Sequence, residues 1–260
     1  MTDVTGVTGI TGVTAGSPNP PAPGTPAGGA ALPTLALATA TGQVGVAVSG
    51  PEGITAAITV RAGRRHGETL APAIQSLLRL AGVELQMLQR VAVDIGPGLF
   101  TGLRVGVATA KALGSALGVP VVPVSSLDIL AHPHRGTGRP VASVVDARRG
   151  EVFWALYQPV GGAMVAVTEA AVASPGALAE ELRRLPADVI LTGDGARRYF
   201  AGSGGPVEVP GSFGVAPEEF DHPSPAVLLA LAATRPDLAP EKVSPTYLRG
   251  ADVRIGWEQR

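Results

Sequence analysis

The sequence predicts an α/β protein built on mixed β-sheets. Short β-branched runs alternate with longer helical patterns between residues 34 and 130, which is typical of this class. A strand–helix–strand unit is expected over Val91–Leu130, and such a crossover joins parallel strands. The first three strands are separated by turns too short for a crossover, so we expect them to be antiparallel.

Three strands are predicted at Thr34–Thr39, Gln43–Ser49 and Ile54–Val60, because glycine-containing turns separate them. An amphipathic helix is predicted at Gly67–Ala81, and Pro72 is placed in its first turn, where proline is tolerated. The apolar face of this helix contains Leu70, Ile74, Leu77, Leu78 and Ala81.

The crossover begins with a buried strand at Val91–Ile95, which the Gly96-Pro97-Gly98 turn ends. Thr101 is predicted to be the N-cap of a helix that runs to about Leu117. Gly118 fits the left-handed residue that ends such a helix.

A second buried strand is predicted at Val121–Val124, and Ser125 with Asp128 is expected to form a capping box for the next helix. The residues from His132 to Pro140 are rich in Gly, Pro and His, so we expect a loop there. This loop separates the first half of the chain from the second.

Small residues recur at every fourth position of the crossover helix, which places them in one stripe: Gly102, Gly106, Ala110, Gly114 and Gly118. Each internal glycine costs about 1 kcal/mol in helix propensity, so close approach of another helix is expected in return. Only Arg104 and Lys111 are long and polar here, so the helix should be covered on two sides, by the sheet and by a second helix from this chain or a partner.

The pattern partly restarts in the second half. Predicted strands are Val141–Asp146, Glu151–Tyr157, Met164–Thr168 and Val189–Thr192; predicted helices are Ser174–Leu185 and Pro225–Ala233; residues 201–222 are loop-rich, and Ser244–Arg249 is a closing segment. The element order of the first half is that of the ribonuclease-H-like fold of the actin–Hsp70–sugar-kinase superfamily. We therefore predict two ribonuclease-H-like subdomains, the second a partial duplication of the first.

The predicted boundaries follow composition. Residues 1–33 are mostly Thr, Gly, Pro and Ala and are expected to form a disordered tail, since they offer little surface to bury. Residues 34–131 are assigned to the first subdomain, joined by the helix at 224–235, and residues 140–223 to the second, smaller one. Residues 236–260 form a C-terminal segment.

Composition limits the function classes. The chain of 260 residues is 45% hydrophobic with a net charge of −1, so a core is expected and no general attraction to nucleic acid. Without cysteine, neither disulfides nor thiolate metal sites can form. No apolar run is long enough for a membrane span and no signal-peptide pattern begins the chain, so we expect a cytoplasmic protein.

Five motifs, in order between Leu35 and Arg249, resemble the signature of the TsaB (YeaZ) family. They are Arg65–Leu70, Gly96–Lys111, Asp146–Phe153, Gly193–Gly195 and Pro245–Arg249. The resemblance implies a role in making N6-threonylcarbamoyladenosine at position 37 of tRNA. It implies a non-catalytic subunit that binds and activates the transferase TsaD, with the ATPase TsaE joining, tRNA contacted only through the complex, and a homodimer when the subunit is alone.

The resemblance also implies that the two helices of the first half meet TsaD in an intermolecular four-helix bundle. The residues predicted at this interface are His66, Leu70, Ile74, Leu103, Gly106, Val107, Ala110 and Gly114. A bulky change such as Gly106→Leu is expected to block the partner without unfolding the protein.

Catalytic ligands of the superfamily are replaced in this chain. Nucleotide-using members carry an Asp in the first strand, where this chain has Ala38. Relatives with TsaD activity carry two metal-binding His four residues apart, at positions that are Ser126 and Leu130 here. We therefore expect no catalytic residue and no metal site, and the spacing of His132 and His134 suits a loop.

A phosphate site at Gly96, Gly98 and Thr101 is the functional interpretation of the strand–helix turn, because free N–H groups at a helix start favour anions. The structural interpretation is a tight turn, and Leu99 replaces the Ser usual in the family. We expect no cofactor of the chain's own; ADP or ATP at the interface with the partner is left open.

Four further groups carry two interpretations each. His66 is either a surface residue at a helix start or an orienting residue at the interface, and Arg64 and Arg65 are a solvated flank or interface contacts. Asp146, Arg148 and Glu151 could do acid–base work, but salt links between the two subdomains are favoured. Asp194, between two glycines, is predicted to be a turn residue.

Two other functions were weighed against the partner subunit. An ATP-dependent phosphotransferase of the same superfamily would need a phosphate-holding carboxylate in the first hairpin, and Ala38 is against it. A metallopeptidase would need a ligand set that the sequence does not offer.

Overall fold

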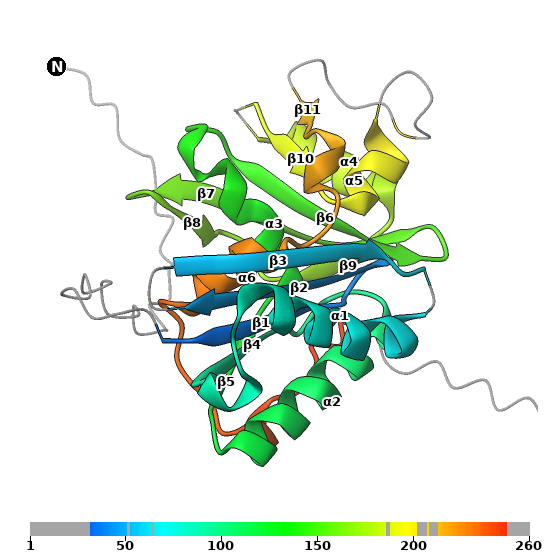
Figure 1. Ribbon diagram of the computed structural model, residues 1–260. Coiled ribbons are helices and arrows are strands. Elements are labelled where there is room, and N and C mark those ends of the chain that lie inside the picture. The colour runs from blue at the N-terminus through cyan, green and yellow to red at the C-terminus, as the bar shows by residue number, and fades with distance from the viewer. Residues whose placement is uncertain are drawn as a thin grey trace, which may run out of the picture.

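A computed structural model describes residues 32–50, 53–63, 65–185, 188–201, 207 and 213–248. The predicted tail before residue 32, Arg64 and the end of the chain from Arg249 lie outside these residues. Two mixed sheets are stacked with helices between them and on their outer faces (Figure 1). This arrangement confirms the predicted fold class.

The first sheet has the order β3-β2-β1-β4-β5. β1 (Thr34–Ala38), β2 (Gln43–Gly50) and β3 (Gly53–Arg61) are antiparallel, as predicted from their short turns. β4 (Arg90–Asp94) and β5 (Val121–Val124) run parallel to β1. The crossover from β4 to β5 therefore brings the carboxyl ends of β1, β4 and β5 to one edge of the sheet.

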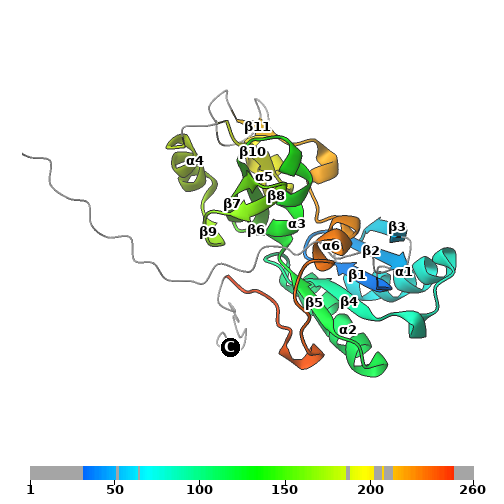
Figure 2. The same ribbon diagram turned by 90° about the vertical axis from the view of Figure 1, so that its left-hand side faces the viewer.

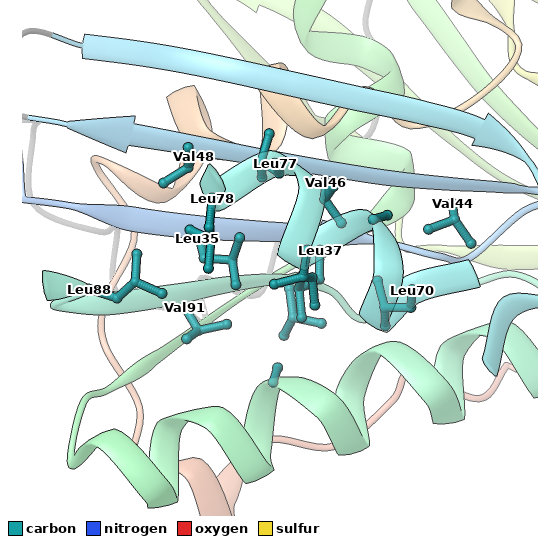
Figure 3. Packing of buried hydrophobic residues seen from close by; sticks show 14 of the residues in the cluster. Leu35, Leu37, Val44, Val46, Val48, Leu70, Leu77, Leu78, Leu88 and Val91 are labelled. Atoms are coloured by element: carbon teal, nitrogen blue, oxygen red, sulfur yellow. The ribbon is translucent and has the colours of Figure 1, made fainter. Parts of the chain in front are cut away.

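Helices α1 (His66–Ala81) and α2 (Phe100–Leu117) cover one face of this sheet. Side chains from β1, β2 and α1 converge in the core between them (Figure 3), among them Leu35, Leu37, Val44, Val46, Val48, Leu70, Leu77 and Leu78. The short turn Leu85–Met87, η1, leads from α1 into β4. Gly118 ends α2 in the left-handed conformation, as predicted.

Three local predictions at helix starts are wrong. Pro72 is the seventh residue of α1, on its exposed side, because the helix begins at His66. Thr101 does not cap α2: the helix begins at Phe100 without a side-chain cap, since the preceding turn is fixed by the Leu99 N–H donating to Ala40 O (2.6 Å). Ser125 caps α3 (Ser126–Ala131) alone, because Asp128 accepts hydrogen bonds from Tyr157 and Arg235 instead.

The opposite face of the first sheet is covered by α6 (Pro225–Ala232) together with α3. Leu228, Leu229 and Ala232 of α6 pack with Ile129 of α3 over the small side chains of β1 and β2. Both helices therefore lie between the two sheets, while α1 and α2 lie on the far side (Figure 2).

The second sheet has the order β11-β10-β6-β7-β8, and β9 also pairs with β7. Its strands are β6 (Val141–Arg148), β7 (Glu151–Val160), β8 (Ala163–Ala166), β9 (Ala171–Ala173), β10 (Ile190–Thr192) and β11 (Gly214–Val215). Helices α4 (Pro175–Arg183) and α5 (Asp194–Phe200) cover one face. α3 packs on the other face, near the short helices η2 (His132–Gly136) and η4 (Glu218–Phe220).

The chain returns to the first sheet after α6. Residues 236–248, which we call the C-terminal strap, run along β5 and then along α2 (Figure 2). Leu238 pairs with Val121, the short helix η5 (Pro240–Lys242) contacts α2, and the Thr246 N–H donates to Ile95 O at 2.8 Å. None of the described helices is both long enough and apolar enough to cross a membrane.

Candidate functional site

The small-residue stripe of α2 is covered by the chain itself. A side chain at Gly102 would collide with the carbonyl oxygen of Thr39, and one at Gly106 with the Thr39 hydroxyl. A side chain at Gly114 would come within 2.9 Å of Pro240 in the C-terminal strap. The stripe therefore admits the β1–β2 turn and the strap, both from this chain, rather than a helix of a partner.

The residues predicted at the interface with TsaD offer little surface to another molecule in the single chain. All eight are buried: His66, Leu70, Ile74, Leu103, Gly106, Val107, Ala110 and Gly114. They face the core between the helices and the sheet, the turns before β2 and before α2, or the strap. A leucine at Gly106 would enter the space of the Thr39 hydroxyl, so we expect Gly106→Leu to disturb the fold itself.

What α1 and α2 expose is a different, neighbouring surface. We call it the outer face, defined by Ala71, Pro72 and Gln75 of α1 and by Phe100, Arg104, Ala108, Ala112 and Ala116 of α2. The α2 members follow one another at four-residue spacing, so they form a straight ridge of mostly small side chains. Such a ridge allows a second pair of helices to pack closely against it.

One end of the outer face carries an aromatic cluster. The rings of Phe100 and Tyr247 lie 5.3 Å apart, and the Arg104 guanidinium carbon lies 4.3 Å from the Phe100 ring centroid. Phe100 and Tyr247 are 46% and 47% exposed. Tyr247 lies on the C-terminal strap, so the strap and α2 together form this end of the outer face.

The turn before α2 holds Gly96, Gly98 and Thr101. The Gly96 N–H donates to Asp94 Oδ1 at 3.0 Å, and the Leu99 N–H donates to Ala40 O. Gly98 packs so tightly on Ala40 that a side chain would collide with its carbonyl group. Two N–H groups of the turn thus serve the fold and a carboxyl group lies beside it, which favours the tight-turn interpretation over a phosphate site.

Asp94 is a fully buried carboxyl group at the end of β4. Its Oδ1 accepts hydrogen bonds from the Ser126 hydroxyl at 2.5 Å and from the Gly96 N–H. Its Oδ2 is buried without a hydrogen-bond partner among the described residues. Burial raises the pKa of Asp94 to about 6, against the opposing effect of the Ser126 and Gly96 hydrogen bonds.

A second polar cluster surrounds Asp146 at the β6–β7 hairpin. Its carboxylate accepts from the Arg148 N–H and guanidinium at 2.9 and 3.0 Å and from the Tyr199 hydroxyl, with Arg198 at 3.5 Å. Its own N–H donates to Asp194 Oδ1 at 2.9 Å. The Asp146 and Arg148 contacts stay within the second half, so their predicted salt links to the first half are wrong.

Asp194 is the first residue of α5 rather than a simple turn residue. Burial raises its pKa to about 6, and the Asp146 N–H opposes this shift by stabilising the carboxylate. The halves are joined elsewhere: the exposed Arg61 of β3 pairs with Glu218 at 2.7 Å. Tyr157 of β7 and Arg235 after α6 both bond to Asp128 of α3.

Two buried histidines, His66 and His134, have internal partners. His66 is 2% exposed and its Nε2 donates to Thr41 O at 2.7 Å, which holds the start of α1 against the β1–β2 turn. His134 is buried, with its Nε2 3.2 Å from the Thr192 hydroxyl and its ring against Phe220. No group of three or more His, Asp or Glu side chains in the described part of the chain is placed to hold a metal ion.

Three residues of these sites were missed from the sequence. Asp94 lies inside a segment interpreted as apolar, and a single acid in a buried strand was the available signal. Phe100 and Tyr247 are aromatic residues in a chain with only 4% aromatic content. Their meeting across the fold had no local signal.

Known proteins are similar to this chain over strands of both sheets. The family model of TsaD, tRNA N6-adenosine threonylcarbamoyltransferase, matches residues 57–191, from β3 to β10. The tRNA threonylcarbamoyladenosine biosynthesis protein TsaB of Bacillus subtilis is 28% identical over 223 residues, which cover 86% of this chain and 96% of that protein. A Mycobacterium leprae protein is 49% identical over 131 residues, and the match spans 48% of this chain but only 35% of that protein.

A solved structure has the same fold over its whole length. YeaZ from Pseudomonas aeruginosa superposes with a TM-score of 0.71 and 30% sequence identity, covering 84% of this chain and 100% of that chain. The similarity therefore extends through both halves and the crossover that carries the outer face.

Proposed function

Because the chain belongs to the TsaB (YeaZ) family, we propose that it is a non-catalytic subunit in N6-threonylcarbamoyladenosine formation on tRNA, acting by binding and activating a TsaD-like transferase. It works in the cytoplasm and brings no nucleotide or metal of its own. A TsaE-like ATPase joins the pair, tRNA is contacted through the complex, and the subunit self-associates through the outer face when alone.

The observation that carries the proposal is the outer face of α1 and α2. Its exposed residues are mostly small and uncharged, with Ala108, Ala112 and Ala116 in line on α2. Packing two helices of a partner against α1 and α2 would make a four-helix bundle. A stable complex of this type buries about 1,200–2,000 Å² in total, which two adjacent helices and the aromatic cluster can supply.

The non-catalytic role is supported by what occupies the superfamily's ligand positions. Ala38, at the end of β1, has no side-chain oxygen that could hold a hard cation, unlike the Asp of nucleotide-using members. The Ser126 hydroxyl is engaged with the buried Asp94. Leu130 is buried among apolar neighbours of the second sheet. Neither the phosphotransferase nor the metallopeptidase is favoured by any of these contacts.

The test is a subunit-omission assay with the cognate TsaD-like and TsaE-like proteins, tRNA and the threonylcarbamoyl donor. We expect modified tRNA when all subunits are present, little when this chain is omitted, and none from this chain alone. Full activity without this chain would contradict its activating role, and product formed by this chain alone would contradict its non-catalytic one.

A further inference from the structure

We infer that Arg104 recognises a carboxylate on the TsaD-like partner, and that contact with the Phe100 ring positions the Arg104 guanidinium for it. The inference rests on the proposed function and names the chemistry of that contact. It also makes the aromatic end of the outer face, rather than the buried glycine stripe, the determinant of partner recognition.

The contact with Phe100 favours one position of the guanidinium in the single chain. Arg104 lies one helical turn after Phe100, and its guanidinium carbon is 4.3 Å from the ring centroid. The Phe100 ring is itself supported by Tyr247, with the two planes inclined at 36°. A guanidinium above an aromatic ring can still offer N–H groups to a second ligand, and its planar fork binds a carboxylate in a bidentate manner.

Arg104 forms no ion pair with any described residue of this chain. Its guanidinium also makes no hydrogen bond with them, and it contacts the Phe100 ring. Arg90, Arg197 and Arg235 in contrast each bond to an aspartate. Lys111, the other cation of α2, donates to the carbonyl oxygens of Glu241 and Val243 in the strap.

The surroundings indicate a protein carboxylate rather than a phosphate of RNA. Arg104 lies over the half-exposed Phe100 ring, which in turn contacts Tyr247, and it begins the alanine ridge of α2. The other cation of α2, Lys111, is bound to carbonyl oxygens of the strap. Contacts to a nucleic-acid backbone usually draw on several cations. An arginine with aromatic neighbours is instead the composition enriched at the energetic centre of protein interfaces.

The experiment measures the dissociation constant between the full-length chain and its purified TsaD-like partner, without tRNA. Arg104→Glu should weaken binding by about thirtyfold or more, as expected for an interface hot spot. Arg104→Lys keeps the charge but loses the planar fork, so we expect about a tenfold loss. Arg184→Glu, at the residue that caps the end of α4, is the matched control; the exposed pair of Arg184 with Glu181 contributes little, so both affinity and fold should be unchanged.

A rescue identifies the carboxylate. Exposed Asp and Glu residues of the partner are changed to Arg one at a time, and we expect one of these changes to restore binding to Arg104→Glu. Thermal unfolding of each variant shows that the fold is retained, which is expected because Arg104 is exposed.

Three results would overturn the inference while leaving the proposed function in place. The first is Arg104→Glu binding the partner within twofold of the wild type. The second is unchanged partner affinity with weakened tRNA binding by the complex, which would assign Arg104 to phosphate. The third is an effect confined to self-association of this chain. Absence of wild-type binding would instead overturn the proposed function, and this inference with it.

Discussion

At the scale of single residues, burial of Asp94 disfavours the charged form of its carboxyl group. The carboxyl group is fully buried and its pKa is raised to about 6 from an ordinary value of 3.8. The folded protein therefore binds this proton more tightly than the unfolded chain does. Between about pH 4 and pH 6 stability falls as the pH rises, and above pH 6 the fold holds a charged, partly unsatisfied carboxylate.

We predict that Asp94→Asn stabilises the protein at pH 8. Asparagine keeps an oxygen that can accept from Gly96 and Ser126 but cannot ionise. The shift of about two pKa units corresponds to about 3 kcal/mol, from which the cost of placing the new amide N–H groups must be subtracted, so a gain of about 1–3 kcal/mol is expected.

Urea denaturation of the wild type and the variant from pH 4 to pH 8 measures this difference. The gain should shrink as the pH falls through 6 and be nearly lost at pH 4, where Asp94 is protonated in the folded protein and partly protonated in the unfolded chain. A gain that is independent of pH, or a loss at pH 8, would show that the carboxylate is not strained by burial.

The strand that carries Asp94 could be predicted from the sequence, but its site could not. Val91–Val93 are apolar and β-branched or small, which indicates a buried strand whatever follows. The partners of Asp94 come from the turn at Gly96 and from Ser126, thirty-two residues away. Only the fold brings these groups together, so periodicity could not reveal the buried acid.

At the scale of elements, α2 shows what a small-residue stripe does and does not reveal. Its four-residue spacing predicts the close approach of a second helix, whereas the turn at Thr39 and the C-terminal strap make the close contact. The segments that make this contact, Thr39 before the helix and Pro240 far after it, have no local signal in the helix sequence. The same spacing therefore fits a partner or the chain's own segments, and the structure selects the latter.

We predict that Gly102→Ala destabilises the protein by about 2 kcal/mol, although alanine has the higher helix propensity. The new methyl group would collide with the carbonyl oxygen of Thr39, which is backbone and has little freedom to move. Gly67→Ala in α1 is the matched control. That position is exposed with no atom near a new Cβ, so a neutral or slightly stabilising effect is expected.

Chemical denaturation of both variants gives the two free energies of unfolding. Equal effects of the two substitutions would mean that the β1–β2 turn does not press on α2. In that case the stripe would be open to a partner after all.

At the scale of the whole molecule, the two sheets share α3 as a common layer. α3 contributes Leu127 and Leu130 to the core of the second sheet and Ile129 to that of the first. Its Asp128 bonds to Tyr157 and Arg235, so one residue ties a strand of the second sheet to the segment after α6. The outer face of α1 and α2 lies on the side of the first sheet that is turned away from α3 and the second sheet (Figure 2).

The order of the main elements and the repeated fold were predictable because long apolar runs and glycine turns mark them. Three short elements were not: β9, β11 and α5 have three, two and seven residues. They are too short to show a period, and α5 begins at a Gly-Asp-Gly sequence that favours a turn. The path of the C-terminal strap could not be predicted either, because its contacts with β5 and α2 join residues far apart in the sequence.

The most direct measurement of the central claim, that the outer face of α1 and α2 binds a TsaD-like partner, is the affinity of Ala112→Trp. Ala112 is exposed at the middle of the α2 ridge, so the variant should fold normally while its indole ring keeps a partner helix away. Ala177→Trp, an exposed alanine of α4 in the second half, is the control. We predict binding weakened by about thirtyfold or more for Ala112→Trp and unchanged for Ala177→Trp. Wild-type affinity of Ala112→Trp, or equal losses in both variants, would contradict the account.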